Sequence, residues 1–338
     1  MRLASLVIAT LALLALAPAP ALAATGSGLK VVMRIPGPDG GWDYASFDAA
    51  RRRVYVAHGN VVLAVNADTE KLNPAFAAGD GLHEVLPIPG SSEILTTNSG
   101  DDTAKILRAS NGSLIAALPV AADADAATYD PATGLAVVVN GAPGLLTLVD
   151  VPARKVVGTI KVDGRLEFAA TDGKGRLYVN VVDKGQVAVV NLKARKVTGY
   201  YAMKGCGRPT GLAYVLGGRL VSSCASGVAM ILDAATGRQI AALKIGGFPD
   251  AVLYDPVRRL AMIPTALDGR LNVIALSGPH DNTIIDRVPT QIGARTGAVD
   301  PKTGRVWLPT ATYNLPVPPG QRPTTKPGTF RILVLDRR

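Results

Sequence analysis

The chain has 338 residues, and its 36 lysines and arginines outnumber its 26 aspartates and glutamates, giving a formal net charge of +10 at pH 7. Aromatic residues make up 5% of the sequence, which argues against a nucleic-acid surface built on base stacking. After residue 23 no apolar run reaches the roughly 18 residues of a membrane-spanning helix, so none is expected.

The first 23 residues are expected to be a secretory signal peptide. Arg2 supplies a charged start, residues 3–16 form an apolar stretch, and residues 21–23 read Ala-Leu-Ala, a small-x-small cleavage site. The alanine-rich composition is typical of bacteria. We therefore expect a periplasmic or secreted protein after cleavage near Ala23, with residues 24–338 as a single domain.

From residue 66 onward the chain repeats itself every 41 to 42 residues. Short apolar runs end in polar turn residues, and these anchors lie at positions 66, 108, 150, 191, 233 and 275. A final copy follows at residues 332–337, 61 residues further on, as though 19 residues (61 − 42) had been inserted. Self-similarity at this period indicates one four-stranded blade per repeat. The fold is therefore predicted to be all-β, a seven-bladed β-propeller of four-stranded antiparallel blades.

The third repeat shows the expected strand pattern, with strands predicted at residues 126–129, 135–139, 145–149 and 156–160. The last repeat lacks a fourth strand, because the chain ends shortly after residue 335. Residues 29–35 match the fourth strands of the other blades. We therefore expect this N-terminal strand to complete blade seven and close the ring without an open sheet edge.

One face of the predicted ring, here called the top face, carries the segments leading into the first strands and the loops between second and third strands. Residues at one repeating position should ring the upper mouth of the central channel, because first strands line the channel. The seven residues at this position are Asp43, Glu84, Asp125, Glu167, Thr210, Asp250 and Arg295, and five of them are acidic. We call this region the channel mouth, and we expect His83 and Arg208 to lie close by.

Two further features are expected on the top face. Residues 312–329 form a proline-rich insertion between the second and third strands of blade seven, long enough to lie over the channel mouth. Cys206 precedes the first strand of blade five, and Cys224 ends its second strand. A disulfide between them would stabilise the fold by about 3 kcal/mol in the loop-entropy model. Two free thiols, or a redox or metal role, are the alternatives.

The remaining turns form the bottom face, which is rich in basic residues. Ordinary solvated turns are the favoured interpretation of this face, and attraction of an anionic partner such as nucleic acid, lipid head groups or an acidic protein is the alternative. Its basic residues are Arg51, Arg52, Arg53, Lys174, Arg176, Arg219, Arg258, Arg259, Lys302 and Arg305 at first turns, and Arg154, Lys155, Lys193, Arg195, Lys196 and Arg238 at third turns.

Several repeat motifs carry a family resemblance. They include Leu-Asp-Ala-Ala-Thr-Gly at 232–237, Tyr-Asp-Pro at 254–256 and Val-Asp-Pro-Lys-Thr-Gly-Arg at 299–305. On these motifs the chain resembles the YncE-like, YVTN-repeat propellers of exported bacterial proteins over nearly its whole mature length. The resemblance implies a seven-bladed propeller and an exported location, and it brings no generally assigned reaction or cofactor. Blades two and five depart from the pattern at 87–90 and 215–218, where Asp-Pro turns are expected.

Carboxylates that converge on a channel mouth repel one another. Some should therefore have raised pKa values, bind a cation, or pair with arginines such as Arg208 and Arg295. One interpretation is a rim whose charges pair with one another. The alternatives are a rim that binds a small molecule or peptide, or one that binds a divalent cation through oxygens from several blades. We expect Asp43 to pair across the strands with His58. Glu84 and His83 follow in the next blade. An ordinary Asp-His hydrogen bond is favoured over a mixed metal site, and a three-histidine zinc site is excluded.

Common catalytic motifs are missing from the sequence. It has no Gly-x-Ser-x-Gly nucleophile elbow, no glycine-rich phosphate loop and no repeated tryptophan motif. No catalytic residue and no cofactor is therefore assigned. The first hypothesis is a monomeric, non-enzymatic scaffold that binds a ligand or a protein at the channel mouth. The alternatives are a metal-dependent hydrolase of the lactonase or gluconolactonase type, and binding of nucleic acid or another anionic surface through the bottom face.

Overall fold

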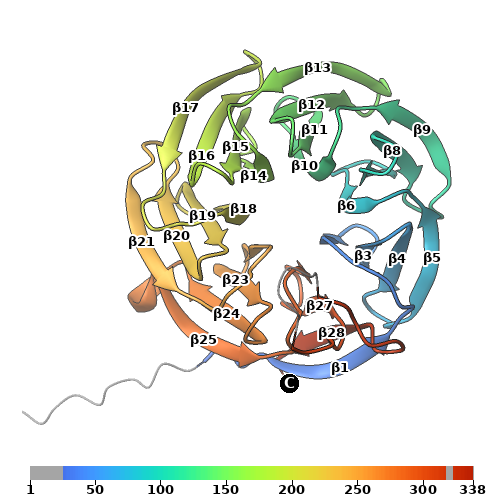
Figure 1. Ribbon diagram of the computed structural model, residues 1–338, viewed down its shortest axis with the longest axis vertical. Coiled ribbons are helices and arrows are strands. Elements are labelled where there is room, and N and C mark those ends of the chain that lie inside the picture. The colour runs from blue at the N-terminus through green and yellow to red at the C-terminus, as the bar shows by residue number, and fades with distance from the viewer. Residues whose placement is uncertain (1–25, 317–322, 338) are drawn as a thin grey trace, which may run out of the picture.

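The computed structural model describes residues 26–316 and 323–337. The expected signal peptide lies outside these residues, as does the middle of the blade-seven insertion, residues 317–322, which contains Pro318 and Pro319. The described chain forms seven four-stranded antiparallel sheets arranged as blades around a central channel (Figure 1). The all-β, seven-bladed propeller predicted from the repeat is confirmed.

The first four blades follow the chain in order. Blade one comprises β2 (Ala45–Asp48), β3 (Arg53–His58), β4 (Val61–Asn66) and β5 (Leu72–Ala78). Blade two comprises β6 (Leu82–Pro87), β7 (Glu93–Asn98), β8 (Thr103–Arg108) and β9 (Leu114–Pro119). Blade three comprises β10 (Ala124–Asp130), β11 (Leu135–Asn140), β12 (Leu145–Asp150) and β13 (Lys155–Lys161). Blade four comprises β14 (Leu166–Thr171), β15 (Arg176–Val181), β16 (Gln186–Asn191) and β17 (Lys196–Ala202).

The remaining blades complete the ring. Blade five comprises β18 (Pro209–Val215), β19 (Arg219–Cys224), β20 (Val228–Asp233) and β21 (Gln239–Lys244). Blade six comprises β22 (Leu253–Asp255), β23 (Leu260–Thr265), β24 (Arg270–Ala275) and β25 (Thr283–Pro289), with the short 3-10 helix η1 (Gly278–His280) before β25. Blade seven comprises β26 (Ala298–Val299), β27 (Val306–Thr310), β28 (Arg331–Asp336) and β1 (Lys30–Pro36).

Ring closure follows the sequence prediction. The N-terminal strand β1 pairs antiparallel with β28, with Lys30 opposite Asp336 and Pro36 opposite Arg331. In Figure 1 the blue β1 lies on the outer rim against the red β28. The two ends of the described chain therefore share one sheet, which leaves blade seven no unpaired outer edge at β28.

The hydrophobic core lies between neighbouring blades. Each blade buries alternating Val, Leu and Ile side chains against the next one, since one sheet face alone cannot exclude water. Val137 and Leu148 of blade three, for example, share a buried cluster with Leu177 and Val190 of blade four. Trp307 of blade seven is fully buried and stacks on Phe47 of blade one at 5.7 Å. Both faces of a blade are thus largely apolar.

The aspartates that open the first turns fold those turns. In blade one the Oδ1 of Asp48 accepts a hydrogen bond from the backbone N–H of Arg51, at 3.0 Å. In blade six the Oδ1 of buried Asp255 accepts bonds from the N–H groups of Val257 and Arg258, both at 3.0 Å. These bonds are the side-chain-to-backbone turns expected of aspartate at the first turn position.

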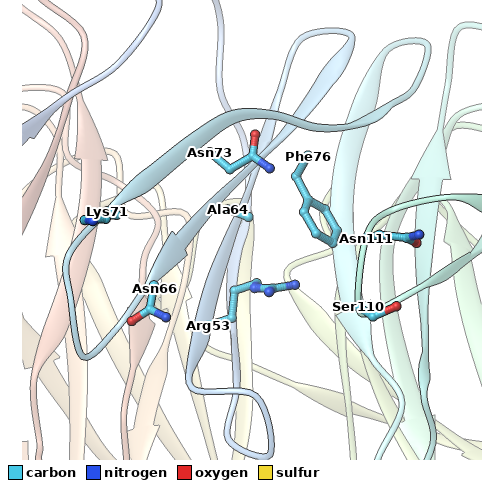
Figure 2. Close-up of a pocket in the computed structure, with 8 residues that line it drawn as sticks. All are labelled: Arg53, Ala64, Asn66, Lys71, Asn73, Phe76, Ser110 and Asn111. Atoms are coloured by element: carbon cyan, nitrogen blue, oxygen red, sulfur yellow. The ribbon is translucent and has the colours of Figure 1, made fainter.

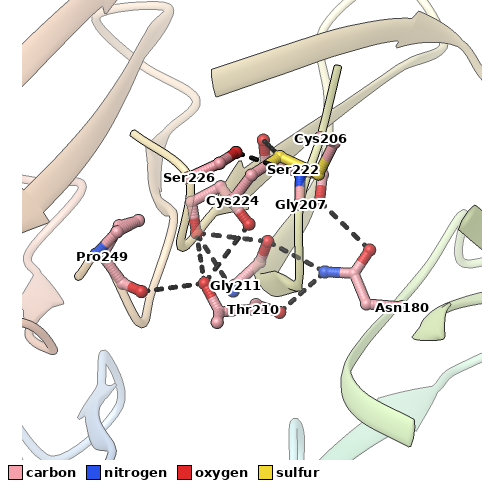
Figure 3. Close-up of a disulfide and its surroundings, with 10 residues drawn as sticks. Asn180, Cys206, Gly207, Thr210, Gly211, Ser222, Cys224, Ser226 and Pro249 are labelled. Atoms are coloured by element: carbon pink, nitrogen blue, oxygen red, sulfur yellow. Dashed lines mark hydrogen bonds between the residues drawn. A yellow bond between two sulfur atoms is a disulfide. The ribbon is translucent and has the colours of Figure 1, made fainter. Parts of the chain in front are cut away.

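The disulfide and the insertion also take their predicted places in the chain. Cys206 and Cys224 form a disulfide that joins the segment before β18 to the end of β19 (Figure 3). The insertion leaves β27 and returns to β28, and Tyr313 and Thr325 within it form an isolated β-bridge. Among the described residues no helix has the length and hydrophobicity needed to cross a membrane.

Candidate functional site

The channel mouth forms because consecutive first strands contact one another around the ring, from β2 through β6, β10, β14, β18 and β22 to β26. The predicted mouth residues lie at or just before the upstream ends of these strands. Asp43 lies two residues before β2, Asp250 three before β22 and Arg295 three before β26. Because these positions are equivalent in every blade, side chains from distant parts of the chain meet here.

Asp43, His83 and Asp125 form the centre of the site. The Nδ1 of His83 lies 2.6 Å from Oδ2 of Asp43 and 3.5 Å from Oδ1 of Asp125. On the other edge of the imidazole, Nε2 of His83 lies 2.9 Å from the hydroxyl oxygen of Ser99. The side chains of His83, Asp43 and Asp125 are 32%, 20% and 17% exposed, respectively, so a ligand in the channel can reach them. Three successive blades thus contribute to one half-buried cluster.

Arg295 ties the opposite side of the mouth to the same centre. Its Nε donates to Oδ2 of Asp250 at 2.9 Å, and its Nη2 lies 3.9 Å from Oδ1 of Asp43. The guanidinium also lies 5.3 Å from the centre of the Trp42 ring and donates to the Trp42 carbonyl oxygen at 2.6 Å. Arg295 is therefore held in place by blades one and six, and its charge is shared between two carboxylates.

Tyr44 reaches across the channel from blade one to blade four. Its hydroxyl donates to Oε1 of Glu167 at 3.4 Å, and its ring meets that of Phe168 edge-on at 5.0 Å. Tyr44 is buried and belongs to the hydrophobic core between blades three and four. Its side chain therefore connects opposite walls of the channel beside the carboxylates.

Burial and mutual repulsion raise the pKa values of three mouth acids, Asp125, Glu167 and Asp250. Loss of solvent, followed by the charge of Asp43, raises the pKa of Asp125 to about 7 and that of Asp250 to about 6. Burial and the neighbouring aspartates raise the pKa of Glu167 to about 9. Burial alone would lower the pKa of His83, but the hydrogen bond and charge of Asp43 outweigh it and raise the value to about 9. At neutral pH the site therefore holds protons on some carboxyl groups and on His83.

Several predicted residues lie at the mouth without joining the central cluster. Glu84 is 4% exposed; its Oε1 accepts the backbone N–H of Val85, and burial raises its pKa well above the usual value. Thr210 donates to the carbonyl oxygen of Pro249 at 2.8 Å and links blades five and six (Figure 3). Arg208 is exposed, and its side chain makes no ion pair with an acid of the described residues.

His58 does not meet Asp43 through its side chain. Its ring is buried and packs edge-on against Phe330 at 4.6 Å, under Gly40, where a Cβ would lie 2.5 Å from the ring. Burial lowers its pKa, and its Nε2 has no hydrogen-bond partner within the described chain. The histidine that pairs with Asp43 is His83 of the next blade.

Sequence reasoning did not single out Tyr44, Ser99 and Trp42 as site residues. Tyr44 and Trp42 flank Asp43 in the chain, and that adjacency is the one signal in the sequence. Ser99 follows β7, and only the register of β6 against β7 brings it to His83.

The cluster presents several carboxyl groups and an imidazole to the channel. Asp43, His83 and Asp125 offer donor atoms that all lie within 4.8 Å of one another, a spacing that also suits a metal ion. Four carboxylates, those of Asp43, Asp125, Glu167 and Asp250, face the cationic side chains of His83 and Arg295. The arrangement provides negative charge in a half-buried space, which favours a cation over an anion.

Ion pairs neutralise part of the charge of the bottom face. Arg52 bonds to Asp68 and Asp300, and Arg305 bonds to Glu70 and Asp336. Other basic residues of this face are paired in the same way: Arg51 with Asp48, Arg219 with Asp281 and Arg258 with Asp255. The predicted basic surface is therefore weaker in charge than the sequence count suggests.

Comparison with known proteins shows the fold. No protein-family model matches the chain, and no curated protein matches it. Among solved structures, the chain is similar to the hydrazine synthase of Kuenenia stuttgartiensis, with a TM-score of 0.70, 14% identity, and coverage of 84% of this chain and 95% of that one. It is also similar to a chain of a mitotic checkpoint complex, with a TM-score of 0.69, 15% identity, and coverage of 92% and 96%. At these identities the likeness is one of fold alone.

Proposed function

We propose that this propeller is a binding scaffold whose channel mouth takes a small molecule or peptide through a guanidinium or ammonium group. The observation that carries this proposal is the meeting of Asp43, Asp125, Glu167 and Asp250 in one half-buried cluster with only two cationic partners. The raised pKa values of Asp125, Glu167 and Asp250 mean that protons occupy the place of a missing positive charge. A ligand cation would replace those protons.

The charge of the whole molecule sharpens this argument. A chain with a formal net charge of +10 repels cations on average, so general attraction does not explain cation binding. Binding of a cation must instead arise from a local concentration of carboxylates. Within the part of the chain that the structure describes, the mouth acids form such a local concentration at the centre of the ring.

The test uses a short peptide whose charge does not change with pH. We expect acetyl-Arg-Gly-Arg-amide to bind saturably by isothermal titration calorimetry, and its counterpart with citrulline in place of arginine to bind at least about tenfold more weakly. The variants Asp125→Asn and Asp250→Asn should weaken binding, whereas Asp268→Asn, which removes an exposed top-face carboxylate in blade six, should not. Equal binding of both peptides, or no response to the two mouth variants, would contradict the proposal.

A second candidate function rests on the spacing of the donor atoms of Asp43, His83 and Asp125. Two carboxylates and one imidazole can hold a divalent cation, and a bound cation could activate water for lactone hydrolysis. This hypothesis predicts stoichiometric metal in the purified protein and turnover of gluconolactone that Asp43→Asn abolishes. Protein that is free of metal, folded and inactive on lactones rules it out.

We also infer that the protein acts outside the cytoplasm. The Cys206–Cys224 disulfide, the apolar segment 3–16 and the resemblance of the repeats to YncE-like exported propellers all support this inference. Expression with and without residues 1–23 tests it. The full chain should appear in the periplasm with Ala24 as its new N-terminus, and cytoplasmic retention of the full chain would contradict the inference.

A further inference from the structure

A polar groove of about 320 Å³ lies between blades one and two, away from the channel mouth. It is lined by Arg53, Ala64, Asn66, Lys71, Asn73, Phe76, Ser110 and Asn111 (Figure 2). These residues come from β3, β4 and β5, from the turn between β4 and β5, and from the turn that follows β8. Its volume falls at the lower end of the range found for small-molecule sites.

The groove exists because blade two approaches blade one closely at this point. Gly112 has a φ of 76°, and a side chain there would collide with the carbonyl oxygen of Phe76. The turn can therefore press its backbone against β5, which places Ser110 and Asn111 beside Phe76. The two walls of the groove are thus fixed relative to each other.

Three asparagines line the groove, and the amide oxygen of each accepts a hydrogen bond from a nearby backbone N–H group. The Oδ1 of Asn66 accepts the backbone N–H groups of Asp68 and Thr69, at 3.0 and 2.8 Å. The Oδ1 of Asn73 accepts from Ala75, and that of Asn111 from Ser113, both at 3.1 Å. Because a backbone N–H can only donate, the oxygen of each side chain faces the backbone. The three amide NH2 groups remain without partners among the described residues.

Two cations add to these donors. Arg53 is fixed by a bond from Nη1 to the Ala109 carbonyl oxygen at 2.7 Å and by its position 4.9 Å from the centre of the Phe76 ring. Its hydrogen bonds within the described chain use Nη1 alone, so Nε and Nη2 are free to donate. Lys71 is exposed and forms no ion pair with a described acid.

The acidic residues of the same turn do not enter the groove. Asp68 pairs with Arg52, and Glu70 pairs with Arg305 of blade seven, on the opposite side of blade one. The lining therefore contains two cations, three amide donors and the hydroxyl of Ser110, with no carboxylate. Such a set of donors complements a group with several acceptor oxygens and a negative charge.

We propose that this groove binds a small polar molecule through a phosphate or carboxylate group, independently of the channel mouth. The oxyanion would lie between Lys71, the amide groups of Asn66 and Asn111, and the free edge of Arg53. The rest of the molecule would lie along Ser110 and Asn73, which can hydrogen-bond hydroxyl groups.

Blade four supplies a matched control for this proposal. The turn from Asn191 to Lys196 is equivalent to that from Asn66 to Lys71, since each pair lies opposite across its hairpin. Asn191 likewise accepts from the backbone, at 2.8 Å from the N–H of Ala194. Here, however, the hydroxyl of Tyr201 replaces the ring edge of Phe76 and bonds to the carbonyl oxygen of Ala235 at 2.9 Å. Blade four therefore has the same turn as blade one, but a different side chain lies beside it.

The experiment measures binding of glucose 6-phosphate, glucuronate and glucose by calorimetry at constant ionic strength. We expect saturable binding of the phosphate ester, the carboxylate or both, which identifies the source of the oxyanion, and no binding of glucose. Asn66→Asp keeps the acceptor that the turn needs and replaces the donor by a negative charge. It should weaken binding by about tenfold or more, as should Lys71→Ala and Asn111→Asp. Asn191→Asp and Lys196→Ala should leave the affinity unchanged.

Three results would overturn the proposal: no binding of either anionic sugar, equal binding of glucose, or equal effects of the blade-one and blade-four variants. Melting temperatures of all variants show whether each remains folded. Because Asn111→Asp lies in blade two, it tests the groove independently if a change in the Asn66 turn affects folding.

Discussion

Asp43 is the residue on which the channel mouth depends, because it contacts a cation on each side. Its Oδ2 lies 2.6 Å from Nδ1 of His83, and its Oδ1 lies 3.9 Å from Nη2 of Arg295. The backbone around it is fixed as well, since Thr296 donates to its carbonyl oxygen at 2.6 Å. A single carboxylate thereby links blades two and seven to blade one.

Replacing this carboxylate tests the electrostatic description of the site. Asp43→Asn removes the charge that holds the proton on His83, so the pKa of His83 should fall from about 9 by at least about one unit. The chain has three histidines, so NMR titration of the imidazole signals can resolve this one. Asp268→Asn should leave it unchanged. An unchanged pKa of His83 in Asp43→Asn would show that the pair does not exist in solution.

Glu167 gives a prediction for stability. The folded protein binds more protons than the unfolded chain wherever a folded pKa exceeds the ordinary value, and Asp125, Glu167, Asp250 and His83 all shift upward. The free energy of unfolding should therefore fall as the pH rises from about 4 to about 9. The His83 contribution is complete below its ordinary pKa of 6.5 and is lost as the pH rises through about 9.

Glu167→Gln cannot ionise, so this variant should lose less stability than the wild type over that range. At pH 8 it should be more stable by about 1 kcal/mol or more, measured by urea denaturation at pH 5 and pH 8. Parallel pH profiles for the two proteins would show that the Glu167 carboxyl is not forced to hold its proton.

At the scale of elements, the disulfide and β1 each tie together parts of the ring. The Cys206–Cys224 bridge joins the segment before β18 to the end of β19 on the top face of blade five. The replacement Cys206→Ser with Cys224→Ser should lower the free energy of unfolding by about 3 kcal/mol, by chain entropy. Binding at the mouth should persist, because neither cysteine contacts the carboxylate cluster. Loss of the propeller fold in the double variant, seen by circular dichroism, would contradict this limited role.

The N-terminal strand has a larger predicted effect. Removing residues 24–36 deletes β1, exposes the edge of β28 and removes Ile35 from the core between blades one and seven. This shortened chain should aggregate or unfold, whereas a chain that begins at Gly26 should remain folded and monomeric. Size-exclusion chromatography and proteolysis compare the two. Equal resistance to proteolysis would show that β1 does not close the ring.

Elements were more predictable from sequence than side-chain contacts. The strand pattern of each blade follows from alternating burial and from aspartate turns such as Asp48 and Asp255, both of which are local features. The sequence predicts His58, across the same hairpin, as the partner of Asp43, but in the structure the partner is His83. His58 turns instead toward Phe330, a residue some 270 positions away, and no local pattern reports such packing.

For the whole molecule, the repeat period was the most informative signal. It predicted that Asp43, Asp125, Glu167, Asp250 and Arg295 share one level of the channel, and Arg295 does contact Asp250 and Asp43 there. It could not predict that Tyr44 reaches Glu167 across the ring, since that contact depends on the channel's width. The period locates the site, and the packing around it determines the chemistry.

We propose that Asp125, Glu167 and Asp250 hold protons in place of a ligand cation. If so, cation binding must release protons and become tighter as the pH rises through the pKa values of Asp250 and Asp125, about 6 and about 7. The most direct measurement is the Kd of acetyl-Arg-Gly-Arg-amide at pH 5.5 and at pH 8.5, with proton release followed in buffers of different ionisation enthalpy. We predict a Kd at least about tenfold lower at pH 8.5, with net proton release on binding. A Kd that is independent of pH, or lower at pH 5.5, would show that the ligand cation does not replace protons at the channel mouth.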